Sequence, residues 1–163
     1  MICRMGRKSI EVGASGQTVA ANITRFRGLR GWTLAQLSEQ LDIVGRPLTG
    51  NTLSAIENCT RRSDTDDLVA IAAALRVSPA ALLMPYVDAS ATPDPSDPSL
   101  VIEQHVPTSA GSGVEAGQLW DWLIADSPLD ASQILERRDE VAIEMWRREQ
   151  VPTWAYRTRL QRE

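Results

Sequence analysis

Apolar residues three and four positions apart recur through the first half of the chain, and this spacing predicts short amphipathic helices. Five such segments lie between residues 18 and 85, so we expect one compact, all-helical (all-α) domain there. The expected core positions of its first, second and fourth helices are Val19, Ile23 and Phe26; Leu34, Leu37 and Leu41; and Leu68, Ile71, Ala72 and Leu75.

The second and third helices of this domain form a closely spaced pair. Thr33 and Gln36 have the spacing of a capping box, in which each side chain accepts a hydrogen bond from the backbone of the other residue. A Gly/Pro turn follows, and Thr49 is expected to cap the third helix. Leu53 and Ile56 form the apolar inner seam of that helix, so the side chains on its other faces are not needed for the core and can contact a ligand.

Small polar side chains occupy the face of this third helix opposite its apolar seam. In a major groove, Asn pairs with adenine through two hydrogen bonds, Ser and Thr bond to either base type, and an Ala methyl group contacts a thymine methyl group. The alternative is a solvated helix face that happens to be small and polar. The residues expected to contact bases are Gly50, Asn51, Thr52, Ser54 and Ala55.

The motifs between residues 18 and 85 resemble those of the lambda-repressor-like helix-turn-helix family, also called XRE or Cro/C1. They are RGWT, LAQLSEQL, TLSAIEN with a basic loop after it, and DDLVAIAAALRVSPAALL. The resemblance implies a five-helix DNA-binding domain in which Glu57 pairs with Arg27 of the first helix. The turn between Leu41 and Thr49 is several residues longer than is usual in the family. The resemblance also implies phosphate contacts by Thr33, Gln36, Thr49, Asn58, Arg61 and Arg62.

Within that family, the pattern is most similar to proteins of high-GC actinobacteria and their phages. The resemblance implies a sequence-specific transcriptional regulator that binds double-stranded DNA, commonly as a homodimer. We expect a repressor that occludes a promoter, and a phage immunity repressor is one such protein. The rival hypothesis is a protein-interaction adaptor, such as an antitoxin-like or anti-repressor protein, which works through the C-terminal half.

Charge separates the two halves of the chain, although the whole chain has a net charge of -4. Residues 1–85 carry 10 Lys and Arg against 7 Asp and Glu, a net charge of +3, whereas residues 86–163 carry 7 against 14, a net charge of -7. DNA affinity depends largely on neutralising phosphates. The half with the helix-turn-helix motifs is therefore the half suited to DNA.

Two segments outside the helical domain differ from it in composition. Arg4, Arg7 and Lys8 mark residues 1–17 as a basic, flexible N-terminal arm. Such an arm either follows a DNA groove, as homeodomain arms do, or serves only as a disordered solubilising tail. Residues 86–118 are rich in Pro, Ser and Gly and are expected to be a linker.

The C-terminal segment, residues 119–163, is expected to be helical and to cover another surface, because so short a segment rarely forms its own core. A second copy of the chain is the most economical partner, which predicts a homodimer. The alternatives are another protein or the chain's own DNA-binding domain. The expected contact surface contains four of the five tryptophans, Trp120, Trp122, Trp146 and Trp154.

One capped helix is predicted within this segment. Asp130 and Gln133 mark its start by their capping-box spacing, and it is expected to end near Gln150, before Pro152. Its arginines alternate with acidic residues on the other faces. Its apolar stripe is expected to consist of Ile134, Leu135, Val141, Ala142, Met145 and Trp146.

Several classes of function are disfavoured. The chain has no apolar run of membrane-span length and no signal-peptide core, so we expect a cytoplasmic protein without a membrane partner. Cys3 and Cys59 lack companions at metal-ligand spacing and are expected to be free thiols, and His105 to lie in a solvated loop, which predicts no metal and no cofactor. Lys8 is the only lysine, which excludes a C-terminal Ser/Lys self-cleaving domain, and we expect no enzyme.

Overall fold

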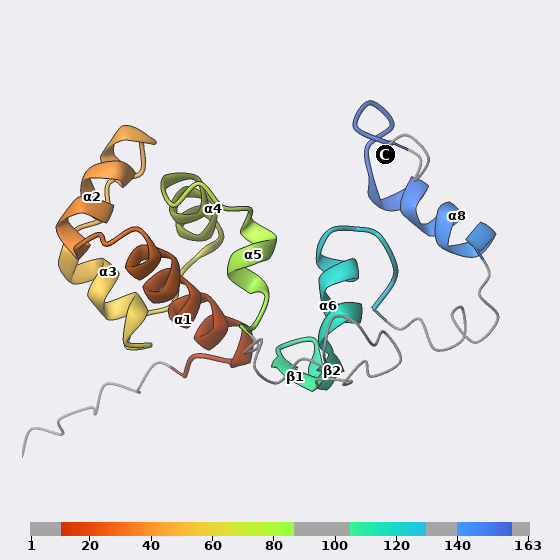
Figure 1. Cartoon of the computed structure of the whole chain (residues 1–163), viewed down its shortest axis with the longest axis horizontal. Helices are drawn as coiled ribbons and strands as arrows, with labels where there is room; N and C mark the ends of the chain where they lie inside the picture. Colours follow the sequence, from red (N-terminus) through yellow and green to blue (C-terminus); the bar gives the residue numbers. More distant parts are fainter. Residues whose placement is uncertain (1–10, 87–104, 130–139, 158–163) are drawn as a thin grey trace, which may run out of the picture.

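The computed structural model describes residues 11–86, 105–129 and 140–157 (Figure 1). Within these ranges the chain is mostly helical and contains one antiparallel β-hairpin. The predicted helical fold with an N-terminal five-helix domain is confirmed, and the described residues add a small two-stranded hairpin that an all-α class does not include. The elements follow in the order α1 (Ala14–Leu29), α2 (Leu34–Ile43), α3 (Gly50–Glu57), α4 (Thr65–Ala74), α5 (Pro79–Leu83), β1 (His105–Thr108), β2 (Gly111–Glu115), α6 (Ala116–Leu123) and α8 (Glu140–Gln150).

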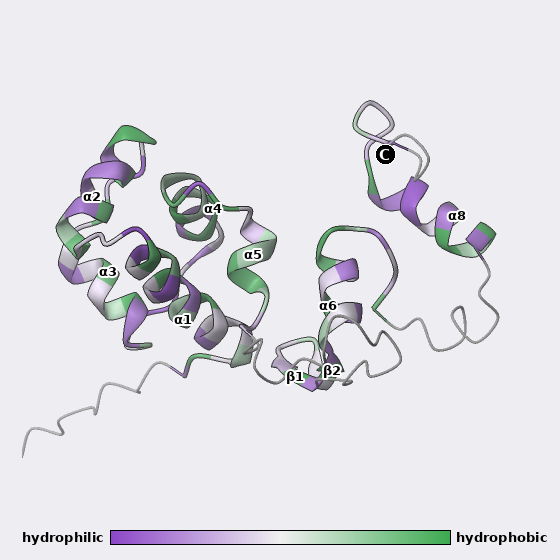
Figure 2. Ribbon diagram, viewed as in Figure 1, coloured by the Kyte–Doolittle hydropathy of each residue, from purple (hydrophilic) through white to green (hydrophobic). Residues whose placement is uncertain are grey.

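Helices α1 to α5 enclose one hydrophobic core. Figure 2 shows hydrophobic and hydrophilic residues alternating along these helices, as expected when each helix buries one face. Phe26, Leu34 and Leu68 are only partly buried, and the other expected core positions are buried. The apolar side chains with no exposed surface come from all five segments and are Ile23, Leu37, Leu41, Leu53, Ile71, Leu75 and Leu82.

Side-chain caps mark the start of four of these helices, and those of Thr33 and Thr49 confirm the expectation from the sequence. Thr33, Thr49, Asp64 and Ser78 each accept a hydrogen bond from a backbone N–H in the first turn of α2, α3, α4 and α5. Helix α1 differs, because it begins at Ala14 rather than near residue 18, so part of the expected N-terminal arm is helical.

A buried asparagine holds α1 against the end of α5. Asn22 is 1% exposed, and its Nδ2 donates to the carbonyls of Ala81, Leu82 and Met84 at 3.3, 3.0 and 2.7 Å. The last carbonyls of a helix have no partner within the helix, and this side chain supplies one for them. The contact fixes the first and last helices of the domain to each other.

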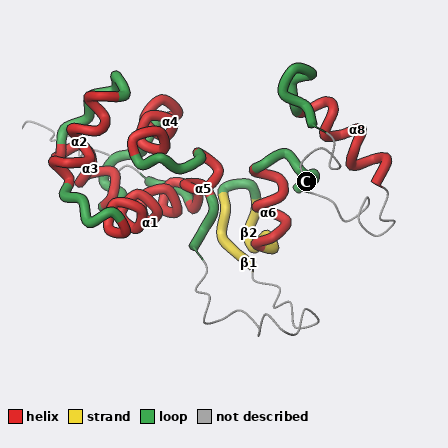
Figure 3. Tube along the Cα trace, turned by 45° about the horizontal axis from the view of Figure 1, so that its top comes forward, coloured by secondary structure: helices red, strands yellow, loops and turns green. Residues whose placement is uncertain are grey.

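Strands β1 and β2 lie between the helical domain and α6 (Figure 3). Val106 pairs with Val114, and the register is interrupted between Val106 and Thr108. Pro107 stands at that interruption, which suits a residue without the N–H that a regular ladder needs. The hairpin falls within residues 86–118, where the sequence predicts a linker.

The hairpin packs on the N-terminal end of α1. The backbone N–H of Ser15 donates to Ser109 Oγ at 3.3 Å, and the backbone N–H of Ser109 donates to Ser15 Oγ at 3.0 Å. The cap residue of α1 is Gly13, which has no side chain to offer. Ser109 therefore takes the place of a local cap for one of the free amides at this helix end.

Helix α8 ends at Gln150, as expected, but buries a different face from the predicted one. Ile143 and Arg147 are its buried residues, whereas Val141 and Met145 are 69% and 63% exposed. The predicted apolar stripe is therefore wrong at Val141 and Met145. The helix buries Arg147 instead, which is possible because acidic side chains compensate its charge. Its nearest carboxylates are Asp126 at 3.6 Å and Glu144 at 3.4 Å. The predicted start of the helix at Asp130 and Gln133 lies outside the described residues.

Candidate nucleic-acid interface

Helices α2 and α3 lie at the end of the helical domain farthest from the hairpin (Figure 1). The capping box of α2 is present, with Gln36 N–H donating to Thr33 Oγ1 at 3.2 Å and Thr33 N–H donating to Gln36 Oε1 at 2.8 Å. Ser38 of α2 donates to the carbonyl of Leu48 at 2.6 Å, which ties the turn to α2 just before α3 begins. The longer turn is therefore held by defined contacts.

The outer face of α3 carries the side chains that the sequence predicts to contact bases. Asn51 is exposed, and Thr52, Ser54 and Ala55 are half-buried along the same helix. Thr52 Oγ1 lies 3.1 Å from Thr49 Oγ1, so it takes part in the cap. Gly50 faces α2, because a Cβ atom there would lie 3.8 Å from the Cβ of Leu34. Asn51 is thus the most accessible of the five.

An ion pair fixes α3 to α1 from the inner side. Arg27 donates from Nε and Nη2 to the two carboxylate oxygens of Glu57, each at 2.8 Å, and from Nη1 to the carbonyl of Trp32 at 2.8 Å. The side chains of Arg27 and Glu57 are only 19% and 9% exposed. The hydrogen bond to Glu57 raises the pKa of Arg27 above its ordinary value. This is the pair that the resemblance implies, in a bidentate geometry that is among the strongest for a charged hydrogen bond.

A second ionic cluster was not predicted from the sequence. Asp67 of α4 has no exposed surface and accepts hydrogen bonds from Arg46 at 2.9 and 3.1 Å and from Arg61 at 3.2 Å. Arg46 precedes α3 and Arg61 follows it, so one carboxylate holds the loops at both ends of the helix. The sequence signal is an aspartate next to the apolar residues of α4, a position that on its own indicates only favourable negative charge at a helix N-terminus.

Comparison with protein families gives a match for the helical domain. Residues 23–82 match the model of the family HTH_3, described as helix-turn-helix. This region is a helix-turn-helix domain. It is of the XRE/Cro-C1 type, and it implies that the protein binds DNA. The matched family is a DNA-binding family and not a catalytic one. Searches of curated proteins and of solved structures gave no match.

Three of the expected phosphate contacts stand at the N-terminal ends of the two central helices of the helix-turn-helix domain. Thr33, Gln36 and Thr49 are exposed, and their side chains are already engaged in the caps of α2 and α3. Helix N-termini present free N–H groups and a partial positive charge, which suits a phosphate. These residues can therefore hold the helix ends that would face the DNA backbone.

The other three expected phosphate contacts are engaged in hydrogen bonds within the chain itself. Asn58 donates from Nδ2 to the carbonyl of Ser54 at 2.8 Å. Arg62 donates from both Nε and Nη2 to the carbonyl of Glu11, with 2.9 Å for the Nε contact. Arg61 keeps 42% of its side-chain surface exposed despite its ion pair with Asp67. Of the two arginines, Arg61 is thus held by a charged partner and Arg62 by a backbone carbonyl.

The remaining predicted site residues are the basic residues of the N-terminal arm and the four tryptophans of the C-terminal segment. Arg4, Arg7 and Lys8 fall outside the described residues. Trp120 and Trp122 on α6 are 37% and 38% exposed, and Trp154 after α8 is 81% exposed, whereas Trp146 is half-buried. Within the described ranges, no helix is long and apolar enough to cross a bilayer, and no cluster of three His, Cys, Asp or Glu could hold a metal ion.

Proposed function

We propose that the protein is a sequence-specific transcriptional regulator that reads the major groove with α3. The observation that carries this proposal is the exposed side chain of Asn51 on a helix whose two ends and inner face are fixed by ion pairs and apolar contacts. A carboxamide side chain can make two hydrogen bonds to adenine, which requires that its helix be presented at a defined angle. The contacts that hold α3 at both ends and on its inner face support such a defined presentation.

We further propose that it acts as a repressor and as a homodimer. A protein bound at a promoter through α3 excludes RNA polymerase sterically, and a phage immunity repressor is the narrower form of this proposal. Two copies would read two half-sites about one helical turn of DNA, roughly 34 Å, apart. The exposed tryptophans of the C-terminal segment supply an apolar surface for pairing.

Binding to fragmented genomic DNA tests the proposal. The fragments should include the DNA that flanks the gene itself, and binding should be measured at two salt concentrations. We expect enrichment of a discrete site with two-fold symmetry, and weaker binding at the higher salt because counterions compete for the phosphates. Asn51→Ala should lose the preference for that site by about tenfold or more while keeping the same salt dependence.

A matched control is Gln150→Ala, because Gln150 is also an exposed carboxamide on a helix but lies in α8. This variant should bind like the unmodified protein. If Asn51→Ala binds the enriched site as tightly as the control does, α3 is not the reading helix.

A second candidate function is a protein-interaction adaptor that works through the acidic C-terminal half. The observation that favours it is Trp154, a tryptophan with 81% of its surface exposed in the half of the chain with net charge -7. Uniform weak retention of all DNA fragments, or none, would support this function over the first.

A further inference from the structure

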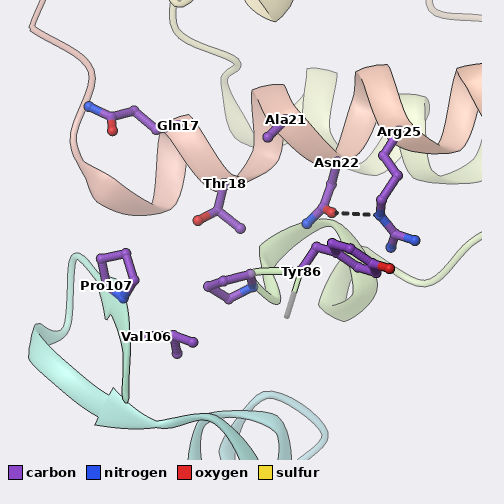
Figure 4. Close-up of a pocket in the computed structure, with 9 residues that line it drawn as sticks. Gln17, Thr18, Ala21, Asn22, Arg25, Tyr86, Val106 and Pro107 are labelled. Carbon is purple, nitrogen blue, oxygen red and sulfur yellow. Dashed lines mark hydrogen bonds between the residues drawn. The ribbon is translucent and has the colours of Figure 1, made fainter. Parts of the chain in front are cut away.

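A cleft of about 550 Å³ separates α1 from β1 and from residues 85–86, at the junction of the helix-turn-helix domain and the hairpin (Figure 4). Sites for small molecules commonly have volumes of about 300 to 1,000 Å³. The helix α1 presents polar side chains to this cleft, and the opposite wall consists of apolar and aromatic side chains. None of the described residues that line it is acidic.

The positive charge of the cleft comes from Arg25. Its Nε donates to Asn22 Oδ1 at 3.3 Å, and its guanidinium carbon lies 4.6 Å from the ring centre of Tyr86 and 4.1 Å from that of Phe26. Asn22 is itself fixed by the three carbonyls at the end of α5. No described residue accepts a hydrogen bond from Nη1 or Nη2 of Arg25, so these two donors are available to a ligand.

Arg25 differs in this respect from the arginines that support α3. Arg27 is paired with Glu57, and Arg46 is paired with Asp67. Those guanidinium groups have carboxylate partners of their own, whereas Arg25 takes part in no ion pair among the described residues. A guanidinium that is held in a fixed orientation by an amide and two rings, and that has no carboxylate partner in the part of the chain that the structure describes, is suited to bind a carboxylate through two parallel hydrogen bonds.

The opposite wall supplies contacts for an apolar body. Val106 and Pro107 of the hairpin face α1 across the cleft, and Tyr86 lies beside Arg25 (Figure 4). Prolines and aromatic rings offer flat, rigid surfaces against which a planar ring packs at little entropic cost. Gln17 and Thr18 add polar groups at the other end of the cleft.

We propose that this cleft is an effector site for a small aromatic carboxylate, whose carboxylate binds Arg25 and whose ring lies between Tyr86 and the hairpin. The ligand contacts both α1 and β1, so it joins the helix-turn-helix domain to the hairpin. The site does not involve α3, and its occupancy can be measured without DNA.

Titration of the full-length, ¹⁵N-labelled protein with benzoate, followed by NMR, tests this site. Saturable shifts are expected at the amides of α1 around Thr18 and Arg25, at Tyr86 and at Val106. Arg25→Gln should weaken binding about tenfold or more, because it removes the charge and the two parallel donors. Benzamide, the neutral analogue of benzoate, should bind about tenfold or more weakly to the unmodified protein for the same reason.

Two further variants separate a lost site from a damaged fold. Arg76→Gln removes an exposed arginine at the end of α4 and should leave benzoate binding unchanged. Tyr86→Ser keeps the charge, changes a side chain that is 63% exposed, and should weaken binding by removing one wall. Equal affinity of Arg25→Gln and the unmodified protein, equal affinity for benzoate and benzamide, or shifts outside the cleft would each overturn the proposal.

Hydrogen exchange gives an independent readout of the bridging role. A ligand that binds only the docked hairpin stabilises it, so at ten times the dissociation constant the amides of β1 and β2 should exchange about tenfold more slowly. Unchanged exchange of these amides at saturating benzoate would show that the ligand does not bridge the two parts.

Discussion

At the scale of single residues, Asp67 determines how α3 is held. Its carboxylate is fully buried and receives one arginine from the loop before α3 and another from the loop after it. A buried carboxylate loses its hydration, so it is tolerated only while charged partners and hydrogen bonds compensate. The hydrogen bond with Asp67 also raises the pKa of Arg46 above its ordinary value.

Asp67→Asn should lower the free energy of unfolding by about 1 to 3 kcal/mol, because the hydrogen bonds from Arg46 and Arg61 lose their charged acceptor. Urea unfolding monitored by circular dichroism measures this change. Asp66→Asn is the matched control, since Asp66 is exposed in the same helical turn and should shift stability by about 0.5 kcal/mol or less. Equal effects of the two substitutions would show that the ion pairs with Asp67 contribute no more than surface charge does.

At the scale of elements, the start of α1 depends on a hairpin that is distant in sequence. Gly13 offers no cap, and Ser109 of the hairpin accepts the free N–H of Ser15 instead. The two contacting segments are 94 residues apart. The hairpin therefore helps to fix where α1 begins, and it forms one wall of the cleft.

Ser15→Ala should release the hairpin from α1, because it removes the acceptor of the Ser109 N–H and the contact with Thr108. We expect a loss of about 1 kcal/mol of local stability, seen as faster hydrogen exchange at the amides of β1, β2 and the first turn of α1. Thr24→Ala is the control, since its hydroxyl bonds only to the carbonyl of Ala20 within the same helix. Hairpin exchange that is the same in both variants would contradict the docking role of Ser15.

The sequence predicted the helices, their caps and the Arg27–Glu57 pair, and it did not predict the hairpin or the Asp67 cluster. Caps and apolar spacing act within one or two turns, so they can be recognised in a local stretch such as Thr33 to Leu41. The contacts of Asn22 with α5 and of Ser15 with Ser109 join segments that are about 60 and 94 residues apart. Nothing local distinguishes such polar residues from solvated ones. Pro107 also made β1 difficult to predict, because proline is disfavoured in regular ladders.

At the scale of the whole molecule, the two halves carry opposite net charges, and the exposed tryptophans lie in the acidic half. The first half has a net charge of +3 and contains the helix-turn-helix domain. The second half has a net charge of -7 and exposes apolar side chains on α6 and around α8. Those with more than a third of their surface exposed are Trp120, Trp122, Ile124, Val141, Met145 and Trp154.

If this surface pairs two copies of the chain, Trp154→Ser should weaken the dimer about tenfold or more, because a largely buried aromatic side chain dominates the energy of such contacts. Sedimentation equilibrium over a range of concentrations measures the dissociation constant. Leu29→Ser is the control, since Leu29 is 71% exposed but lies at the end of α1. An unmodified protein that stays monomeric throughout would exclude the homodimer and favour another partner for the tryptophans.

The position of Asp67 has a consequence for genetics. A random screen for clones that no longer bind DNA selects every change that tilts α3, whether or not the altered side chain reaches the double helix. Asp67 is buried, yet both flanks of α3 depend on it, so its substitutions should be recovered alongside those of Asn51. A map of DNA-contacting residues drawn from such a screen alone would wrongly include this buried residue of α4.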